Sequence, residues 1–251
     1  MSSSPTWWWA PAAMPPSLVV KEAARRHIPT AVHESNAVPG LTTKALSKVV
    51  DCVMVGFEES RAHYDNPDKV VVTGTPVRGD FFRQTREQAR QKLGLTDDRP
   101  LAVSFWGSLG ARFMNEHMLD FFRLEVKDGM PFHHVHAAGK GSWDAMHQTL
   151  EAEQLTKTPG LDVREYIYDM ADVMRAGGSG DLPGGSLHRQ RADGAGSPGG
   201  DRPPPPYVTN NHQEKNARIL EKHGGARVIL EKDATGEALY RAAGEILRSP
   251  E

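Results

Sequence analysis

Short apolar runs alternate with amphipathic segments along most of the chain. Runs rich in β-branched residues predict strands at Thr30–His33, Cys52–Gly56, Val70–Thr73, Leu101–Phe105, His133–Ala137, Asp162–Tyr166 and Ala226–Leu230. Helical spacing of apolar residues predicts helices at Ser17–His27, Thr42–Val49, Thr85–Leu93, Gly110–Arg123, Ser142–Glu153, Asp169–Met174, His212–His223 and Thr235–Arg248. This alternation predicts an α/β fold with parallel sheets covered on both faces.

Two stretches break the pattern. Residues 1–16 are rich in Ser, Pro, Ala and Trp, and Ala176–Pro206 holds 9 glycines and 6 prolines among 31 residues. A segment of that composition buries too little apolar surface to offset its ordering entropy, so we expect an extended loop there. The charged, proline-flanked piece from Phe82 to Pro100 is the expected domain boundary.

Composition narrows the function. The 32 acidic and 30 basic residues of this 251-residue chain give a net charge of -2, which argues against nucleic acid as a partner. The single cysteine, Cys52, permits no internal disulfide and favours a reducing compartment. No apolar run approaches the ~20 residues of a membrane-spanning helix, although Trp7–Trp9 could lie at a lipid interface.

One glycine-rich loop follows a predicted strand and opens a predicted helix. It contains Gly107, Ser108, Leu109, Gly110 and Ala111. Free N–H groups and the positive dipole end at such a helix start suit a phosphate or diphosphate, and Ser108 adds a hydroxyl donor. The alternative is a tight turn that binds nothing.

Polar residues follow two other predicted strands. Asn36 lies just past a strand end and has the donor and acceptor groups that sugar hydroxyls require, or else the loop only caps the next helix. Arg78 offers a planar fork to a phosphate or carboxylate, or else is a surface arginine after a turn. His134 and His136 share a strand face and His133 points away, a pattern more typical of a structural role than of a metal site.

Read in order, these motifs resemble the MurG family of peptidoglycan glycosyltransferases. The resemblance covers residues 17–175 and 207–250. It is carried by His33-Glu34-Ser35-Asn36-Ala37-Val38-Pro39-Gly40-Leu41-Thr42, Gly74-Thr75-Pro76-Val77-Arg78, Gly107-Ser108-Leu109-Gly110-Ala111-Arg112, His136-Ala137-Ala138-Gly139-Lys140-Gly141, Tyr166-Ile167-Tyr168-Asp169-Met170 and His212-Gln213-Glu214-Lys215-Asn216-Ala217.

The resemblance implies two Rossmann-like domains of the GT-B type, with the N-terminal one truncated. It implies an aberrant segment at 1–16, half of an acceptor domain at 17–81, a linker at 82–98 and a UDP-sugar domain at 99–250 interrupted at 176–206. The implied substrate-binding residues are Asn36 and Arg78 on the acceptor side, Ser108 on the diphosphate, Ile167 beside the uracil and Gln213 on the sugar. It implies no metal and no cofactor.

The implied reaction transfers N-acetylglucosamine from UDP-N-acetylglucosamine to undecaprenyl-diphospho-muramoylpentapeptide, turning lipid I into lipid II. The implied partners are that donor, the lipid acceptor and the cytoplasmic face of the plasma membrane, where the family is peripheral. Two alternatives remain open. One is a soluble, non-catalytic fragment with weak or no UDP binding, and the other is a different sugar-nucleotide enzyme, such as an epimerase, on the same fold.

The chain also departs from the family pattern. The family's proposed catalytic histidine belongs to a loop that would lie before residue 1, so the catalytic residue is unknown here. Read one base out of phase, Pro5–Met14 and Gly177–Gly196 can encode the missing second glycine loop and the missing UDP-binding segment, with the Arg191 codon contributing a ribose-binding glutamate. We therefore expect a frame-shifted, truncated relative that is inactive as printed.

Overall fold

The computed structural model describes residues 16–106, 112–178, 186–188 and 212–248. The chain divides into two compact units. The first comprises Met1–Pro76 with Arg191–Ala226, and the second comprises Val77–Gln190 with Arg227–Glu251. The expected linker at 82–98 contains α3 (Arg86–Lys92), which lies within the second unit.

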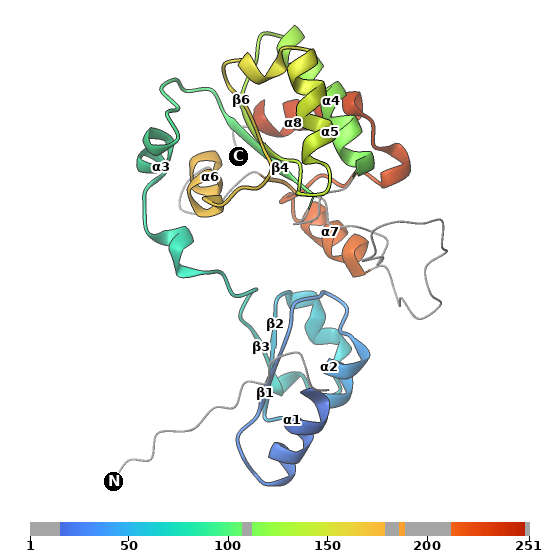
Figure 1. Cartoon of the computed structure of the whole chain (residues 1–251). Helices are drawn as coiled ribbons and strands as arrows, with labels where there is room; N and C mark the ends of the chain where they lie inside the picture. Colours follow the sequence, from blue (N-terminus) through green and yellow to red (C-terminus); the bar gives the residue numbers. More distant parts are fainter. Residues whose placement is uncertain (1–15, 107–111, 179–185, 189–211, 249–251) are drawn as a thin grey trace. The chain divides into compact units, whose positions relative to one another are not determined.

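The first unit is built on a parallel sheet of three strands in the order β1-β2-β3 (Figure 1). These are β1 (Ala31–Glu34), β2 (Cys52–Val55) and β3 (Val70–Val72). Helices α1 (Pro16–Arg25), α2 (Leu41–Leu46) and α7 (His212–Lys222) belong to the same unit, as do the 3-10 turns Glu58–His63 and Pro67–Lys69. Apolar residues of β2 and α2, with Val50, Tyr64 and Val70, form its core.

The second unit has a four-stranded parallel sheet in the order β6-β5-β4-β7. Its strands are β4 (Leu101–Phe105), β5 (His133–Ala137), β6 (Leu161–Arg164) and β7 (Ser186–His188). The helices are α3, α4 (Arg112–Lys127), α5 (Trp143–Ala152), α6 (Met170–Gly177) and α8 (Gly236–Arg248), with 3-10 turns at Gly79–Phe82, Leu155–Lys157 and Glu231–Asp233.

Strand alternation sorts the side chains of this sheet into two buried layers. Leu101 and Val103 join a cluster with residues of α3 and α6, whereas Ala102 joins a larger cluster with residues of α4, α5 and α8. Successive side chains of a strand point to opposite faces, so a five-residue strand serves both layers. The prediction of an α/β fold with parallel sheets covered on both faces is confirmed for this unit (Figure 1).

Two local predictions need correction. The segment Ala226–Leu230 forms no strand; it leads into the 3-10 turn Glu231–Asp233, and Ile229 packs against the larger cluster. The segment Ala176–Pro206 is also not wholly a loop where it is described. Ala176 and Gly177 complete α6, and β7 pairs with β4 through Val103–Phe105. β7 includes Leu187, one of only two large aliphatic residues in that segment of the sequence.

Within the described ranges, the longest helix is α4, and none of the helices has the length and apolar character needed to cross a membrane.

Candidate functional site

The loop after β1 is organised by the carboxylate of Glu34. Its Oε1 accepts hydrogen bonds from the backbone N of Asn36 at 3.0 Å and from Asn36 Nδ2 at 2.8 Å, and its Oε2 accepts from Gly40 N at 2.9 Å. Burial acts to raise the pKa of Glu34, but the hydrogen bonds outweigh it, so the pKa lies below its ordinary value. An ionised carboxylate therefore holds this loop in one shape.

Asn36, expected to face a sugar, uses both ends of its amide inside the protein. Nδ2 donates to Glu34, and Oδ1 accepts a hydrogen bond of 3.0 Å from Asn216 of α7. The neighbouring Ala37 N–H donates to Asn216 Oδ1 at 2.8 Å. His33 Nε2 also lies 3.0 Å from the carbonyl oxygen of Gly74, so two of the predicted motifs meet in the first unit.

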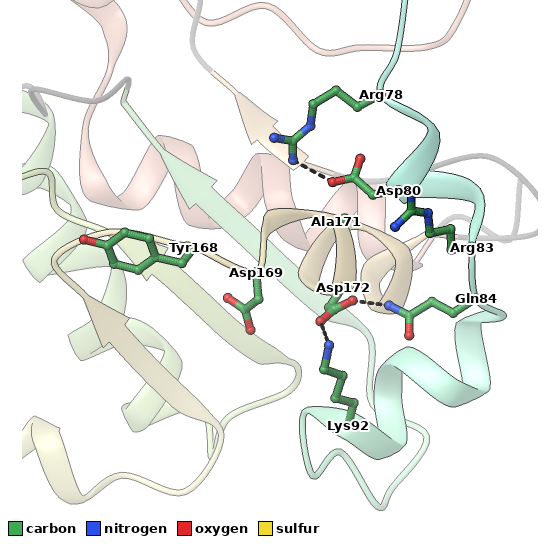
Figure 2. A pocket seen from close by; sticks show the side chains of 9 residues that line it. All are labelled: Arg78, Asp80, Arg83, Gln84, Lys92, Tyr168, Asp169, Ala171 and Asp172. Atoms are coloured by element: carbon green, nitrogen blue, oxygen red, sulfur yellow. Dashed lines mark hydrogen bonds and ion pairs between the residues drawn. The ribbon is translucent and has the colours of Figure 1, made fainter.

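Arg78 lies in the second unit and lines a cavity of about 530 Å³ (Figure 2). The segment before α3 and α3 itself contribute one wall, and the turn before α6 and its first residues contribute the other. The lining side chains are Arg78, Asp80, Arg83, Gln84, Lys92, Tyr168, Asp169, Ala171 and Asp172.

Charges of both signs meet in this cavity, and most of them are paired. Arg78 bridges to Asp80 at 3.0 Å, and Asp172, which is buried, accepts from both Lys92 and Gln84 (Figure 2). The guanidinium of Arg83 has no side-chain or backbone partner among the described residues. It is therefore the cation of this cavity most available to an anionic ligand.

Ile167, expected beside a uracil, is buried beside the start of α6. Ile167 is only 2% exposed and packs in the cluster with Val173 and Ala176. Its neighbours Tyr166 and Tyr168 are exposed, and their rings lie 4.9 Å apart between centroids. The tyrosine rings are the groups at this position that reach solvent, so they are better placed than Ile167 to stack on a base.

The other predicted residues are only partly covered. Gly107, Ser108, Leu109, Gly110 and Ala111 lie outside the described residues, but β4 ends just before them and α4 begins just after them, as the sequence predicted. Gln213 is the second residue of α7, and its side chain also lies outside the described part. Their substrate-binding roles stay predictions.

A buried polar network under the sheet was missed from the sequence. Ser104 Oγ lies 2.7 Å from both His134 Nε2 and His136 Nδ1, and His134 Nδ1 lies 2.8 Å from Glu125 Oε1. The serine, histidine and glutamate are spaced as in a hydrolase triad. All three have no exposed surface, so no substrate reaches them and the network is structural. The shared face of His134 and His136 was predicted.

Comparisons with known proteins point in one direction. The profile of the Glycosyltransferase family 28 C-terminal domain matches residues 204–251. The UDP-N-acetylglucosamine--N-acetylmuramyl-(pentapeptide) pyrophosphoryl-undecaprenol N-acetylglucosamine transferase of Acetivibrio thermocellus is 38% identical over 230 residues, covering 92% of this chain and 61% of that protein. The protein of the same name from Thermoanaerobacter sp. (strain X514) is 38% identical over 235 residues, covering 93% and 63%.

This chain belongs to the MurG family. It spans about three fifths of the length of these MurG relatives. The crystal structure of Acinetobacter baumannii MurG has a related fold, with a TM-score of 0.57 at 23% identity, over 90% of this chain and 60% of that one. The family resemblance and the α/β fold predicted from the sequence are thereby confirmed.

Proposed function

We propose that this chain serves the transfer of N-acetylglucosamine from UDP-N-acetylglucosamine to undecaprenyl-diphospho-muramoylpentapeptide. The observation that carries the proposal is the 38% identity, along 92% of the chain, to a relative named for that transfer. Within the proposal, Asn36 and Arg78 serve the acceptor side, and Ser108, Ile167 and Gln213 serve the donor. The family is peripheral to the membrane, and we place this chain at the cytoplasmic face.

Transfer of the sugar requires the donor side of the site to stabilise the departing diphosphate. A helix start that follows a glycine-rich loop does so with backbone N–H groups and the positive end of the helix dipole. The loop 107–111 before α4 has that sequence character, and the hydroxyl of Ser108 adds one donor. Such fixed donors stabilise developing negative charge without a metal ion.

Within this proposal, the cavity of the second unit offers further positive charge to a phosphate group. Among the described residues, the guanidinium of Arg83 has no partner, and Arg78 pairs with Asp80, whose Oδ1 is buried without a hydrogen bond. A phosphate group entering the cavity would draw both guanidinium groups and leave Asp80 in need of a new donor. The exposed rings of Tyr166 and Tyr168 offer a stacking surface for a base.

A second candidate function is UDP binding without transfer. It is favoured by the composition of Ala176–Pro206, because the family's acidic segment for the ribose is expected there and glycine and proline stand in its place. Loss of one positioning or charge-stabilising group typically costs a hundredfold or more in rate.

One assay separates these functions. The purified chain is incubated with UDP-N-acetylglucosamine labelled in the sugar and with a lipid I analogue. Label in the lipid together with free UDP supports transfer, and UDP binding without labelled lipid supports the second candidate. A changed sugar configuration with no acceptor consumed would identify an epimerase and contradict both.

A further inference from the structure

Helix α7 is fastened to the first unit by one buried side chain. Asn216 is 6% exposed and lies in the second turn of α7, where it contacts the loop after β1. Its Oδ1 accepts the N–H of Ala37, which is fully buried, and its Nδ2 donates to Oδ1 of Asn36. These two hydrogen bonds join parts of the chain that are about 180 residues apart in the sequence.

The hydrogen bonds can form in one orientation only. Glu34 is ionised and can only accept, so the Asn36 amide must turn Nδ2 toward it and Oδ1 toward Asn216. Asn216 must then present Nδ2 to Asn36, which leaves its Oδ1 for the N–H of Ala37. The chain from Glu34 through Asn36 to Asn216 is thus fully satisfied, and a residue without both a donor and an acceptor cannot replace Asn216.

The second contact of α7 is weaker. His223, just past the end of the helix, lies 2.7 Å from Glu59 through Nε2, but its side chain is 63% exposed. Exposed pairs of this kind contribute little to stability, whereas a buried donor left without its acceptor loses the bond that offsets its desolvation. Of these two contacts, the one made by Asn216 is the stronger.

Helix α7 also falls within the stretch matched by the glycosyltransferase family 28 C-terminal domain, residues 204–251. Gln213, the residue expected on the donor sugar, precedes Asn216 by three positions, which is about one helical turn. Helix α7, which belongs to the segment matched by the donor-binding domain, is thus held by Asn216. That residue hydrogen-bonds to the loop of Asn36, which is expected on the acceptor side.

We propose that Asn216 is a positioning residue. It holds α7 against the loop at 33–40 and so fixes the position of Gln213 relative to Asn36. The inference rests on the proposed function for the roles of Gln213 and Asn36. It does not rest on that function for the attachment itself. If it holds, occupancy of the donor site is transmitted to the Ala37 amide through Asn216.

Amide hydrogen exchange at Ala37, followed by NMR on the whole chain, tests the attachment. We expect Asn216→Ala to lower the protection of Ala37 at least tenfold, and Asn216→Asp, which keeps the acceptor for Ala37 but loses the donor to Asn36, to lower it at least threefold. The control His223→Gln should leave it within twofold. Equal protection in Asn216→Ala and the unaltered chain, or an equal loss in all variants, would overturn the proposal.

Addition of UDP-N-acetylglucosamine distinguishes a positioning role from a merely structural one, because only the positioning role predicts that the ligand changes the protection of Ala37. With both proteins saturated by the ligand, we expect the protection of Ala37 to rise at least threefold in the unaltered chain and not in Asn216→Ala. A rise in both proteins would overturn the coupling. If neither protein binds the ligand, the proposed function fails, and the loss of protection in Asn216→Ala still decides the attachment.

Discussion

At the scale of single residues, the hydrogen bonds around Ser104, His134 and His136 determine which nitrogen of each histidine carries a proton. Asn115 Nδ2 donates to a backbone carbonyl, so its Oδ1 faces His136 Nε2 and accepts a hydrogen bond from it. His136 then offers a bare Nδ1 to the hydroxyl of Ser104, which in turn accepts from His134 Nε2. One proton therefore lies between His134 Nδ1 and Oε1 of Glu125.

The buried surroundings of Glu125 and His136 favour the uncharged form of each side chain. Burial raises the pKa of Glu125 above its ordinary 4.5, with His134 acting in the opposite direction, and Oε2 of Glu125 has no partner among the described residues. Burial, with a smaller effect of His134, lowers the pKa of His136 well below its ordinary 6.5. A neutral, protonated Glu125 that donates a hydrogen bond to His134 agrees with its raised pKa and with the hydrogen-bond pattern of the network.

These shifts predict opposing pH dependences of the free energy of unfolding. The contribution of Glu125 is complete below pH 4.5 and is lost as the pH rises toward its raised folded pKa. The lowered pKa of His136 destabilises the fold as the pH falls below 6.5, because only the unfolded chain then takes up a proton. Urea unfolding between pH 4.5 and 6.5 should thus show two opposing effects, a loss of stability with rising pH from Glu125 and a gain from His136.

Glu125→Gln tests the assignment, since an amide NH₂ can donate to His134 as the protonated carboxyl does. We expect the variant to lose the decline in stability that Glu125 causes above pH 4.5, which is at most about 1.4 kcal/mol per pH unit for one proton. Glu116→Gln, on the exposed side of the same helix, should keep the decline. An unchanged decline in Glu125→Gln would mean that Glu125 is ionised in the folded protein.

Sequence reasoning at this scale succeeded where the signal was local. Strand alternation placed His134 and His136 on one face, as observed. It could not find Glu125, because that carboxylate reaches the network from a separate helix, nor Asn216, whose partners lie about 180 residues away. Asn36 appeared free to bind sugar hydroxyls because its contact with Glu34 was not recognised within the motif, and Asn216 lies about 180 residues away.

At the scale of elements, α8 approaches α4 more closely than a side chain allows. A Cβ atom added to Gly236 would lie 2.5 Å from Asp120 Cβ and 2.7 Å from the carbonyl oxygen of His117. We therefore expect Gly236→Ala to lower the free energy of unfolding by about 1–3 kcal/mol through overpacking, despite the better helix propensity of alanine.

The matched control is Gly79→Ala, in the same unit, where an added Cβ has no heavy atom within 4 Å. Urea unfolding at neutral pH should show a change below about 0.5 kcal/mol for this variant. Equal effects of the two substitutions would show that the approach of α8 to α4 is not tight.

Element prediction worked where caps and periodicity agreed. The helix expected at Thr85–Leu93 is α3, and a capping box between Thr85 and Gln88 fixes its start. The segment Ala226–Leu230 misled because three consecutive apolar residues, Val228 to Leu230, are equally compatible with an irregular segment that packs on a core. The pairing of β7 with β4 depends on long-range contacts that composition does not report.

At the scale of the whole molecule, the sequence predicted the family and the class of fold, because six motifs in one order are far more specific than any one motif. The domain scheme and the five substrate-binding residues stay predictions. The decisive region is the segment from Gly177 onward, where the composition departs from the family and a shifted reading frame can encode a strand, a helix start and a glutamate.

The central claim is that the second unit belongs to a UDP-sugar site of the MurG type that the segment from Gly177 onward has altered. Isothermal titration with UDP tests it most directly. The printed chain is compared with a form carrying Ala-Asp-Leu-Val-Ile-Cys-Arg-Ala-Gly-Ala-Ser-Thr-Ala-Ser-Glu-Leu-Thr-Ala-Leu from position 177. We predict at least tenfold tighter UDP binding by the replaced form, and loss of that gain with Ser108→Ala. Binding no tighter than that of the printed chain, or no binding by either form, would contradict the account.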